Sequence, residues 1–467
     1  ATLGPASSTN EIMLVLVKAG ADVFRINFSH ADYELVKRNV DIIREINQEY
    51  GYNISILGDL QGPKLRVGVV KEGSFLNPGD VLTFTNEPCE GDSTKVFMTY
   101  EKFPQDVKVG ERILIDDGKL VFEVIETNQK DTVKAKTIQG GPLSSKKGVN
   151  LPNTNVSLPA LTEKDIEDAK FMIENEFDWI ALSFVRHAQD IIDLKKLIEA
   201  HSDFKIPIIA KIEKPEGVKN IDEILLECDG LMVARGDLGV EVPMEEVPVI
   251  QKKLVDKARY YSKPVIIATQ MMETMISSLT PTRAEVNDVA NNVLDGADSV
   301  MLSGETSVGI YPVDVVKNIT KIIKNIESTN LYEKKNDIIE KITCVDDRFV
   351  TDMVCLNAVK IAETTGAAAI ITLTHSGYTA FQISAHRPTS RIIVYSSNRR
   401  VLTMLNLLWG VRAFYYDMNK STDETVIQVN MLTHHYGYVE KGDFVVNLNA
   451  MPVYEGGKTN TLRLTNI

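Results

Sequence analysis

The stretch at residues 206–237, IPIIAKIEKPEGVKNIDEILLECDGLMVARGD, decides how the rest of the chain is interpreted. Residues 206–213 and 230–237, at its two ends, are short apolar runs that finish in charged residues. Such runs, each followed by a longer segment with helical spacing, are typical of parallel strands joined by helices. The same pattern predicts six more strands, at residues 1–4, 22–29, 54–59, 179–185, 264–271 and 299–305.

Eight strand-and-helix units predict a (β/α)8 barrel. The helical segments at 33–50 and 244–261 place their apolar residues on one stripe, as an outer barrel helix requires. Residues 1–4 stand at the very start of the chain, with no initiator Met and no leader pattern, so we expect the natural start to be missing or processed.

A gap of about 120 residues between the third and fourth runs breaks this rhythm. Within it, residues 81–85 and 112–115 alternate apolar and polar positions, and Asp117-Gly118 is a hairpin turn signal. The gap therefore predicts a small β-domain. We expect a catalytic barrel at 1–63 and 152–330, the inserted β-domain at 64–151, and a C-terminal α/β domain at 331–467, with Gly62-Pro63 and Leu158-Pro159 as hinges.

Composition excludes several classes of protein. The chain has 467 residues, 44% of them hydrophobic, which is enough for several buried cores. Its net charge of −13 disfavours nucleic-acid binding, and no apolar run approaches the roughly 20 residues of a membrane span. The four cysteines, Cys89, Cys228, Cys344 and Cys355, form no CxxC pair, which favours reduced thiols and a cytoplasmic location.

A barrel carries its active site where the strands end at the C-terminal mouth. Nearly every predicted strand delivers polar side chains to this rim: Arg25, Asn27, Ser29, His30, Asp59, Lys211, Glu213, Arg235, Gly236, Asp237, Thr269, Gln270, Ser303 and Glu305. Polar residues also mark strand ends without any function, which is the alternative interpretation. Lys211 and Glu213 argue against it, because alternation places both on the same strand face.

Glu213 and Asp237 follow neighbouring strands, so their carboxylates are candidates for one Mg²⁺ or Mn²⁺ ion. The alternative is a pair of salt bridges to Lys211 and Arg235. Lys211 itself suits either a fixed positive charge beside a transferring phosphoryl group or a Schiff-base amine.

The remaining rim residues suggest three binding functions. Arg25 is a candidate phosphate clamp or, alternatively, half of a structural ion pair. Asn27, Ser29 and Asp59 offer oxygen atoms to a monovalent cation. Residues 236–238 open a short helix whose N–H groups suit a carboxylate, with Thr269 completing that pocket. The chain contains no GxxxxGK[ST] phosphate loop, so any ATP or ADP must be bound without one.

Several motifs resemble the pyruvate kinase family, in order and over essentially the whole chain. They are ATLGPASS at 1–8, FRINFSH at 24–30, MVARGDLG at 232–239, ATQM at 268–271, PTRAE at 281–285, MLSGET at 301–306, THSGYT at 374–379 and TNT at 459–461. The resemblance implies phosphoryl transfer from phosphoenolpyruvate to ADP, giving pyruvate and ATP in the last step of glycolysis.

The resemblance also assigns roles to residues. It implies Mg²⁺ on Glu213 and Asp237, phosphoryl stabilisation by Lys211 and Arg25, and a substrate carboxylate held by Thr269 and the amides near Gly236. It further implies that Thr269, with Ser303 and Glu305 behind it, helps to protonate the enolate. The nucleotide, with a second Mg²⁺, is expected between the barrel and the β-domain, on Arg25, Asn27, His30, Arg66 and Lys164.

One motif departs from many family members. Where they read Asp-Thr-Lys-Gly-Pro-Glu and depend on K⁺, this chain reads Asp59-Leu60-Gln61-Gly62-Pro63-Lys64. The Lys64 ammonium can replace the charge of K⁺ at the site that Asn27, Ser29, Asp59 and Leu60 would form, and Val67 also resembles the K⁺-independent branch. We therefore expect activity without added K⁺.

The resemblance leaves regulation open. Thr374, Ser376, Gly377 and Thr379 resemble an effector loop for a sugar phosphate or a nucleotide, but residues 450–458 lack an arginine anchor, so a vestigial pocket is the alternative. The family implies a homotetramer. Two rival functions are a metal-dependent barrel aldolase or lyase that handles pyruvate enolate, and a catalytically silent metabolite-binding protein.

Overall fold

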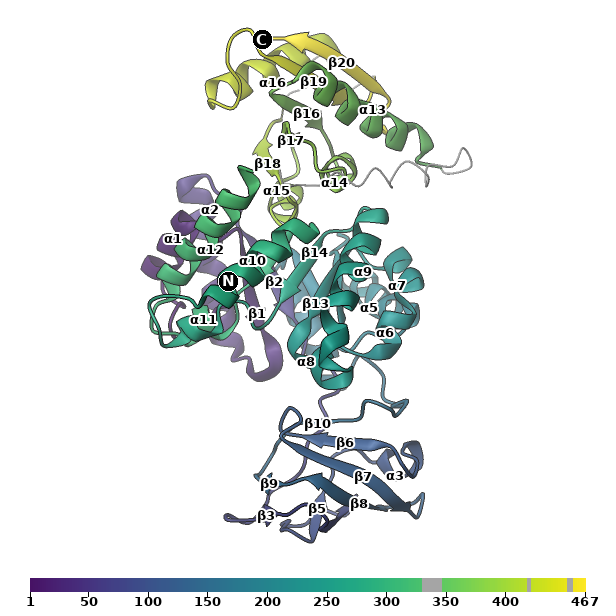
Figure 1. Ribbon diagram of the computed structural model, residues 1–467. Helices are drawn as coiled ribbons and strands as arrows, with labels where there is room; N and C mark the ends of the chain where they lie inside the picture. The colour runs from purple at the N-terminus through teal and green to yellow at the C-terminus, as the bar shows by residue number, and fades with distance from the viewer. Residues whose placement is uncertain (330–346, 418–420, 452–456) are drawn as a thin grey trace.

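The computed structural model describes residues 1–329, 347–417, 421–451 and 457–467, without the side chains of His30 and Thr422. The described residues form three lobes in a row, with the barrel in the middle (Figure 1). Each lobe encloses hydrophobic residues of its own. The polypeptide leaves the barrel for the β-domain and returns to it before it enters the C-terminal lobe.

Seven parallel strands form the barrel wall in the order β1-β2-β11-β12-β13-β14-β15. Their bounds are Val23–Asn27, Ser55–Asp59, Trp179–Leu182, Ile208–Ile212, Gly230–Ala234, Val265–Ala268 and Ser299–Met301. Residues 1–3 occupy the eighth position: Thr2 forms a parallel bridge with Arg25 of β1, and its N–H donates to the carbonyl of Leu302 at 3.0 Å. The predicted (β/α)8 barrel is confirmed, with its first strand reduced to this bridge.

Helices surround the barrel because each buries one apolar stripe against the strands. They are α1 (Asn10–Ala19), α2 (Tyr33–Tyr50), α4 (Glu163–Glu174), α5 (Ala188–His201), α6 (Pro215–Lys219), α7 (Ile221–Glu227), α8 (Arg235–Glu241), α9 (Val247–Tyr260), α10 (Arg283–Asp295), α11 (Gly304–Ser307) and α12 (Pro312–Glu327). Three 3₁₀ turns, η1 (Phe28–His30), η2 (Met244–Glu246) and η3 (Glu273–Ile276), lie in the connections.

Most of the predicted strands end earlier than expected, which places several site residues in the turns that follow them: β1 ends at Asn27, β11 at Leu182 and β14 at Ala268. The strand expected to reach Asp237 ends at Ala234, and residues 235–237 form the first turn of α8, which is the short helix expected from residues 236–238. A helix N-terminus stabilises a carboxylate such as that of Asp237. Strand β15 ends at Met301, and the Glu305 carboxylate accepts a hydrogen bond from the N–H of Ser303 at 2.6 Å just before α11. The helix expected from residue 244 begins at Val247, because a proline at the next position suits a first turn.

The inserted lobe is a small β-domain, as predicted, whose main sheet is antiparallel except for one parallel pair at its edge. Its main sheet has the order β10-β6-β7-β8-β4-β5, and residues 116–119 make the predicted turn between β6 and β7. The bounds are β3 Phe75–Leu76, β4 Val81–Thr85, β5 Lys95–Phe97, α3 Phe103–Asp106, β6 Arg112–Ile115, β7 Leu120–Thr127, β8 Thr132–Gln139, β9 Gly141–Pro142 and β10 Val149–Asn150.

The C-terminal lobe is an α/β sandwich with the strand order β18-β17-β16-β19-β20. The sequence patterns missed β18, β20, α14 and α15, which are short or exposed and carry weak periodicity. The bounds are α13 Phe349–Thr365, β16 Ala369–Leu373, α14 Tyr378–Ala385, β17 Arg391–Ser396, α15 Arg399–Leu405, β18 Val411–Tyr415, α16 Thr422–His435, β19 Phe444–Asn449 and β20 Thr461–Asn466.

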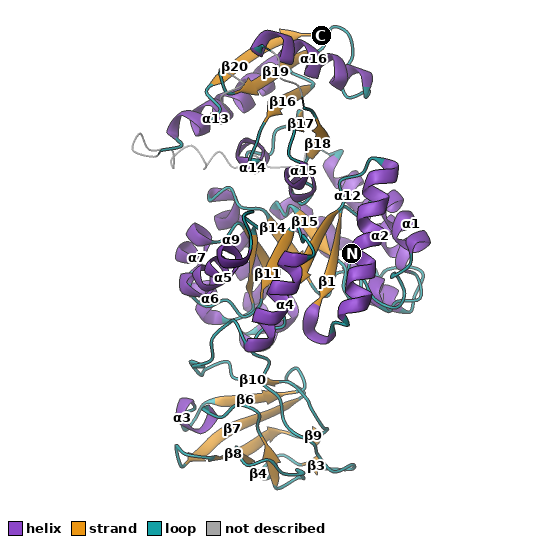
Figure 2. Cartoon of the chain, turned by 180° about the vertical axis from the view of Figure 1, so that it is seen from behind, coloured by secondary structure: helices purple, strands orange, loops and turns teal. Residues whose placement is uncertain are grey.

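The two outer lobes attach to opposite ends of the barrel (Figure 2). The β-domain follows the C-terminal end of β2, whereas the C-terminal lobe covers the N-terminal ends of the strands. There Leu407 joins the core inside the barrel, and the indole N–H of Trp179 donates to the carbonyl of Met404 at 3.1 Å. The mouth on the β-domain side is therefore the one where a site can form.

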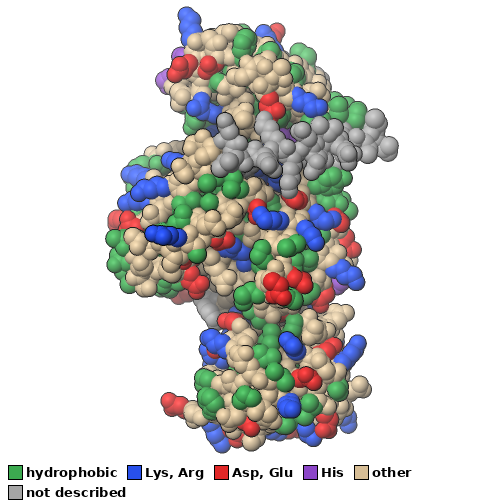
Figure 3. Space-filling model, viewed as in Figure 1, with side chains coloured by type: hydrophobic (Ala, Val, Ile, Leu, Met, Phe, Trp, Pro, Cys, Tyr) green, Lys and Arg blue, Asp and Glu red, His purple; other side chains and the backbone are tan. Residues whose placement is uncertain are grey.

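Acidic and basic side chains are interspersed over the face shown in Figure 3. No helix among the described residues is long and apolar enough to cross a membrane.

Candidate active site

A buried ion network around Lys211 occupies the mouth of the barrel. The Nζ atom of Lys211, on β12, lies 3.0 Å from Asp59 Oδ1 and 3.0 Å from Glu213 Oε1, and it donates a hydrogen bond to Ser183 Oγ at 2.6 Å. All four residues are buried. Burial alone would lower the pKa of Lys211, but Asp59 and Glu213 together raise it above its ordinary value. The ammonium form is therefore stabilised, which argues against the Schiff-base alternative.

Asp59 joins this ammonium to the guanidinium of Arg25. Arg25, on β1, donates from Nε to Asp59 Oδ2 at 2.7 Å and from Nη1 to Thr2 Oγ1 at 3.1 Å. Burial would raise the pKa of Asp59, but the charges of Lys211 and Arg25 lower it below its ordinary value. One ionised carboxylate on β2 thus pairs with two cations, Arg25 on β1 and Lys211 on β12, and holds both at the mouth of the barrel.

Glu213 and Asp237 provide the pair of carboxylates expected to bind a metal. Glu213 Oε2 accepts a hydrogen bond from the N–H of Phe184 at 2.8 Å. Burial and the charge of Asp237 raise the pKa of Glu213, the Lys211 ammonium lowers it, and the net effect is a pKa of about 7. The two carboxylates are therefore close enough to repel one another, which is an arrangement that a divalent cation relieves.

The salt-bridge alternative for these carboxylates is only half correct. Glu213 does pair with Lys211, but Arg235 makes a two-pronged ion pair with Asp288 of α10, at 2.7 and 2.8 Å. No group of three or more metal-binding side chains occurs in the described residues. Glu213 and Asp237 can thus supply two hard oxygen ligands, and the rest of the shell must come from substrate and water.

Thr269 closes the site from the end of β14. Its Oγ1 accepts a hydrogen bond from the N–H of Gly236 at 2.7 Å and donates to the carbonyl of Ala268 at 2.6 Å. Thr269 and Gln270 both have positive φ, 68° and 52°, which is a strained conformation for residues with a Cβ atom. Arg235 supports this turn, since its Nη2 donates to the carbonyls of both residues at 2.8 and 3.2 Å.

Ser303 and Glu305 lie behind this turn. Glu305 is buried, and its Oε1 accepts a weak hydrogen bond from the N–H of Met272 at 3.4 Å while Oε2 binds the N–H of Ser303. The carboxylate therefore connects the loop after β14 to the start of α11.

The residues predicted to bind the nucleotide lie in two places. Asn27 Oδ1 accepts a hydrogen bond from the N–H of Ser29 at 3.1 Å, and Lys164 of α4 donates to the carbonyl of Phe28 at 2.7 Å while pairing with Asp168. Arg66 lies in the β-domain, where it donates to the carbonyl of Lys146 at 2.8 Å. The side chain of His30 lies outside the described residues.

Lys64 is exposed to solvent, whereas Asp59 and Leu60 of the expected monovalent-cation site are buried. Lys64 is exposed and lines a cleft of about 50 Å³ between the barrel and the β-domain, together with Phe184 and Asp237. The Asp59 carboxylate is occupied by Arg25 and Lys211, and the carbonyl of Leu60 accepts a hydrogen bond from Ser183 Oγ at 2.6 Å.

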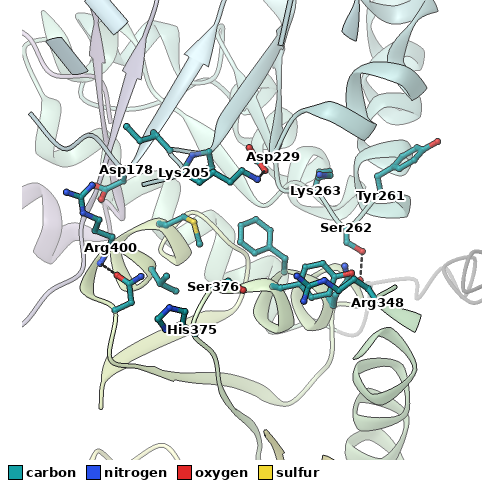
Figure 4. Close-up of a pocket in the computed structure, with 18 of the residues that line it drawn as sticks. Asp178, Lys205, Asp229, Tyr261, Ser262, Lys263, Arg348, His375, Ser376 and Arg400 are labelled. Carbon is teal, nitrogen blue, oxygen red and sulfur yellow. Dashed lines mark hydrogen bonds and ion pairs between the residues drawn. The ribbon is translucent and has the colours of Figure 1, made fainter. Parts of the chain in front are cut away.

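The residues of the expected effector loop lie in two environments: Thr374 and Gly377 form a turn, and Ser376 lines a cavity. The N–H of Gly377, at φ 86°, donates to Thr374 Oγ1 at 2.9 Å, and Thr379 is buried with its hydroxyl 2.8 Å from that of Thr459. Ser376 instead lines a cavity of about 670 Å³ between the barrel and the C-terminal lobe, where it and His375 lie across from Lys205, Asp229 and Lys263 (Figure 4). Part of the 450–458 loop lies outside the described residues.

Sequence reasoning missed Ser183, Phe184 and Asp288. Ser183 and Phe184 follow directly on β11, so the rule that strand ends carry the site would have found them. Asp288 carried no such signal, because it lies in the middle of a helix and meets Arg235 only through packing.

Comparison with known proteins gives a consistent result. Residues 1–316 match the family model "Pyruvate kinase, barrel domain", and residues 352–465 match "Pyruvate kinase, alpha/beta domain". The chain is 40% identical to the pyruvate kinase of Mycobacterium intracellulare over 100% of this chain and 97% of that protein, and 42% identical to that of Geobacillus stearothermophilus over 99% and 79%. A crystal structure of a pyruvate kinase from Cryptosporidium parvum superimposes with a TM-score of 0.94 at 33% identity, covering 100% of this chain and 94% of that one. Nothing in these matches favours the aldolase or lyase alternative.

Proposed function

The chain belongs to the pyruvate kinase family, and from this premise we propose how its own residues carry out the reaction. The enzyme is a phosphotransferase that acts on phosphoenolpyruvate and ADP and requires a divalent metal. The observation that carries the proposal is the position of Lys211 Nζ, 3.0 Å from the carboxylates of both Asp59 and Glu213.

Lys211 and Arg25 stabilise the phosphoryl group during transfer. Asp59 holds both cations in place, so no reorganisation is needed when negative charge spreads over the transferring oxygens. Ser183 directs the Lys211 ammonium through its 2.6 Å hydrogen bond.

Glu213 and Asp237 hold the metal, which we propose to be Mg²⁺ or Mn²⁺ because both ligands are carboxylates. When bound, such a cation supplies positive charge to the phosphate and enolate oxygens. Glu213 must lose its proton to serve as a ligand, and its N–H partner Phe184 keeps the carboxylate oriented.

Thr269 and the start of α8 receive the substrate carboxylate. In the structure, Thr269 Oγ1 accepts the hydrogen bond of the Gly236 N–H, so we propose that substrate takes over this donor. Thr269, with Ser303 and Glu305 behind it, then helps to deliver a proton to the enolate through water.

The nucleotide binds between the barrel and the β-domain, with a second Mg²⁺. On the barrel side, Asn27 and Lys164 form hydrogen bonds to the backbone of residues 28 and 29, just after β1. On the β-domain side, Arg66 donates to the carbonyl of Lys146. We propose that these three residues bind the nucleotide together with Arg25 and His30. Closure of the β-domain would exclude water, which otherwise competes as the phosphoryl acceptor.

The decisive experiment measures pyruvate formation from phosphoenolpyruvate with and without ADP. We expect pyruvate only when ADP is present, and we expect Lys211→Met to lower kcat by a factor of about 100 or more, in line with the loss of a preorganised charge. ADP-independent cleavage at the same rate would refute the proposal.

We also propose that turnover needs no K⁺. The support is that the Asp59 carboxylate already pairs with two cations, Arg25 and Lys211, and that Lys64 lines the cleft with Asp237. Activity in buffer free of Na⁺ and K⁺ tests this, and a many-fold rescue by K⁺ would reject it. Lys64→Glu is expected to create K⁺ dependence.

The remaining assignments are proposals of the same kind. We propose domain bounds of 1–63 with 152–330, 64–151 and 331–467, a homotetramer, and an effector loop at Thr374, Ser376, Gly377 and Thr379. We propose a cytoplasmic location because Cys228 and Cys355 are buried free thiols, as a reducing compartment allows.

A further inference from the structure

Glu241, at the C-terminal end of α8, is a buried carboxylate that connects the barrel to the β-domain. Its side chain is 1% exposed. Its Oε1 accepts a hydrogen bond from Asn150 Nδ2 of β10 at 2.7 Å and one from the ammonium of Lys214. Its Oε2 has no hydrogen-bond partner among the residues that the structure describes. Both connections of Glu241 therefore converge on one oxygen atom.

Glu241 and its partner Lys214 both lie close in sequence to a candidate metal ligand. Asp237 lies four positions earlier on the same helix, so the two carboxylates are one helical turn apart. Lys214 directly follows Glu213, the other metal-binding candidate. Asn150 is the last residue of the final β-domain strand, where the chain returns to the barrel. Glu241 thus joins the return crossing of the β-domain to both carboxylate-bearing elements.

The segment by which the chain leaves the barrel for the β-domain, after β2, is bound to a different helix, α4. The N–H of Gly62, at φ 71°, donates to Asp165 Oδ1 of α4 at 3.0 Å. The segment that returns to the barrel is bound at two places: Arg186 donates to the carbonyls of Val156 and Leu158, and Asn150 donates to Glu241. The bond at Asn150 is the one made by the β-domain strand itself, so it restricts rotation of the β-domain about the two crossings. A hydrogen bond from a neutral amide to a buried carboxylate is about twice as strong as one between neutral groups, so it can set an orientation.

We infer that Glu241 is a positioning residue, which sets the orientation of the β-domain over the metal-binding carboxylates through its hydrogen bond to Asn150. The inference rests on the proposed seat of the nucleotide between the two lobes. Loss of the bond loosens the β-domain while the barrel residues stay in place. ADP is then bound less tightly, and water gains access to the phosphoryl group.

The test compares Asn150→Ala with Asn153→Ala. Asn153 is a matched control, because it is an amide three residues away whose Oδ1 accepts a hydrogen bond from the N–H of Arg112, within the β-domain, at 3.4 Å. In Asn150→Ala we expect KM for ADP to rise about tenfold, the change expected when one charge-assisted hydrogen bond is lost, with KM for phosphoenolpyruvate within about twofold of the parent. We also expect more than one pyruvate to form for each ATP.

A double-mutant cycle distinguishes loss of the Asn150–Glu241 hydrogen bond from unrelated structural effects of each substitution. If the hydrogen bond is responsible, Asn150→Ala combined with Glu241→Ala raises KM for ADP no further than Glu241→Ala alone. The inference is overturned if Asn150→Ala matches Asn153→Ala in both readouts, or if it lowers kcat with KM for ADP unchanged and equal yields of pyruvate and ATP. Neither result affects the proposed function, which fails only if the parent enzyme itself shows no ADP-dependent pyruvate formation.

Discussion

Acidification from about pH 8 to about pH 6 is expected to weaken divalent-metal binding about tenfold, because Glu213 takes up a proton in this range. Burial raises the pKa of this carboxyl to about 7 in the metal-free protein. One pH unit above that value about nine-tenths of the groups are ionised, and one unit below it about one-tenth are. Only the ionised form serves as a ligand, so the apparent affinity follows this ratio.

Titration calorimetry with Mn²⁺ measures both parts of this prediction. Repeating it in buffers with different ionisation heats counts the protons released, which should approach one per metal ion at about pH 6 and fall to about one-tenth at about pH 8. Glu213→Gln is the control, since the amide cannot titrate, and it should bind metal weakly at every pH. Equal Mn²⁺ affinity of the parent enzyme at the two pH values would refute the reasoning. So would a Glu213→Gln variant whose Mn²⁺ affinity changes with pH as much as that of the parent.

The same pKa predicts the stability of the metal-free protein. The pKa of Glu213 is about 7 in the folded state, above its ordinary value of 4.5, so between these values the folded protein holds the extra proton. The contribution of Glu213 to the free energy of unfolding therefore falls as the pH rises from 4.5 to about 7. Above about pH 7 the ionised carboxylate lowers the free energy of unfolding by its full amount, about 3 kcal/mol. Metal should remove this cost, and thermal unfolding with and without Mn²⁺ across the window would show it.

Three further outcomes are expected. Ser183→Ala should lower kcat about tenfold with little change in Tm, because it removes the hydroxyl that directs Lys211 Nζ, and steady-state kinetics would detect it. Arg387 and Asp298 form a buried ion pair at 2.9 Å, and Arg387→Met should destabilise the protein by about 3 to 5 kcal/mol because the Asp298 charge then keeps, among the described residues, only backbone N–H donors; denaturant unfolding should show partial recovery when Asp298→Asn is added. Thr269→Gly should lower kcat even though it relieves the positive φ, because it removes the hydroxyl that binds the Gly236 N–H, and an unchanged kcat would exclude Thr269 from the reaction.

Local sequence patterns were sufficient to predict the barrel, the inserted β-domain and the α/β tail. Apolar runs of strand length separated by helical periodicity are a property of neighbouring residues, and so is the switch to alternation within 64–151. The rim residues could also be predicted, because strands of a barrel present their C-terminal ends at one mouth. That Lys211 and Glu213 point the same way follows from the two-residue period of a strand alone, since Lys211 lies on β12 and Glu213 directly follows it.

Tertiary structure decided which partners these residues have. Asp59 was assigned to a cation site, but it lies between Arg25 and Lys211, because the curvature of the barrel brings the ends of β1, β2 and β12 to one point. The alternative interpretation pairs Arg235 with a nearby carboxylate of the rim, but Arg235 pairs with Asp288 on α10. Hydrogen bonds and ion pairs form across space, whereas a sequence pattern reports only how residues alternate along the chain.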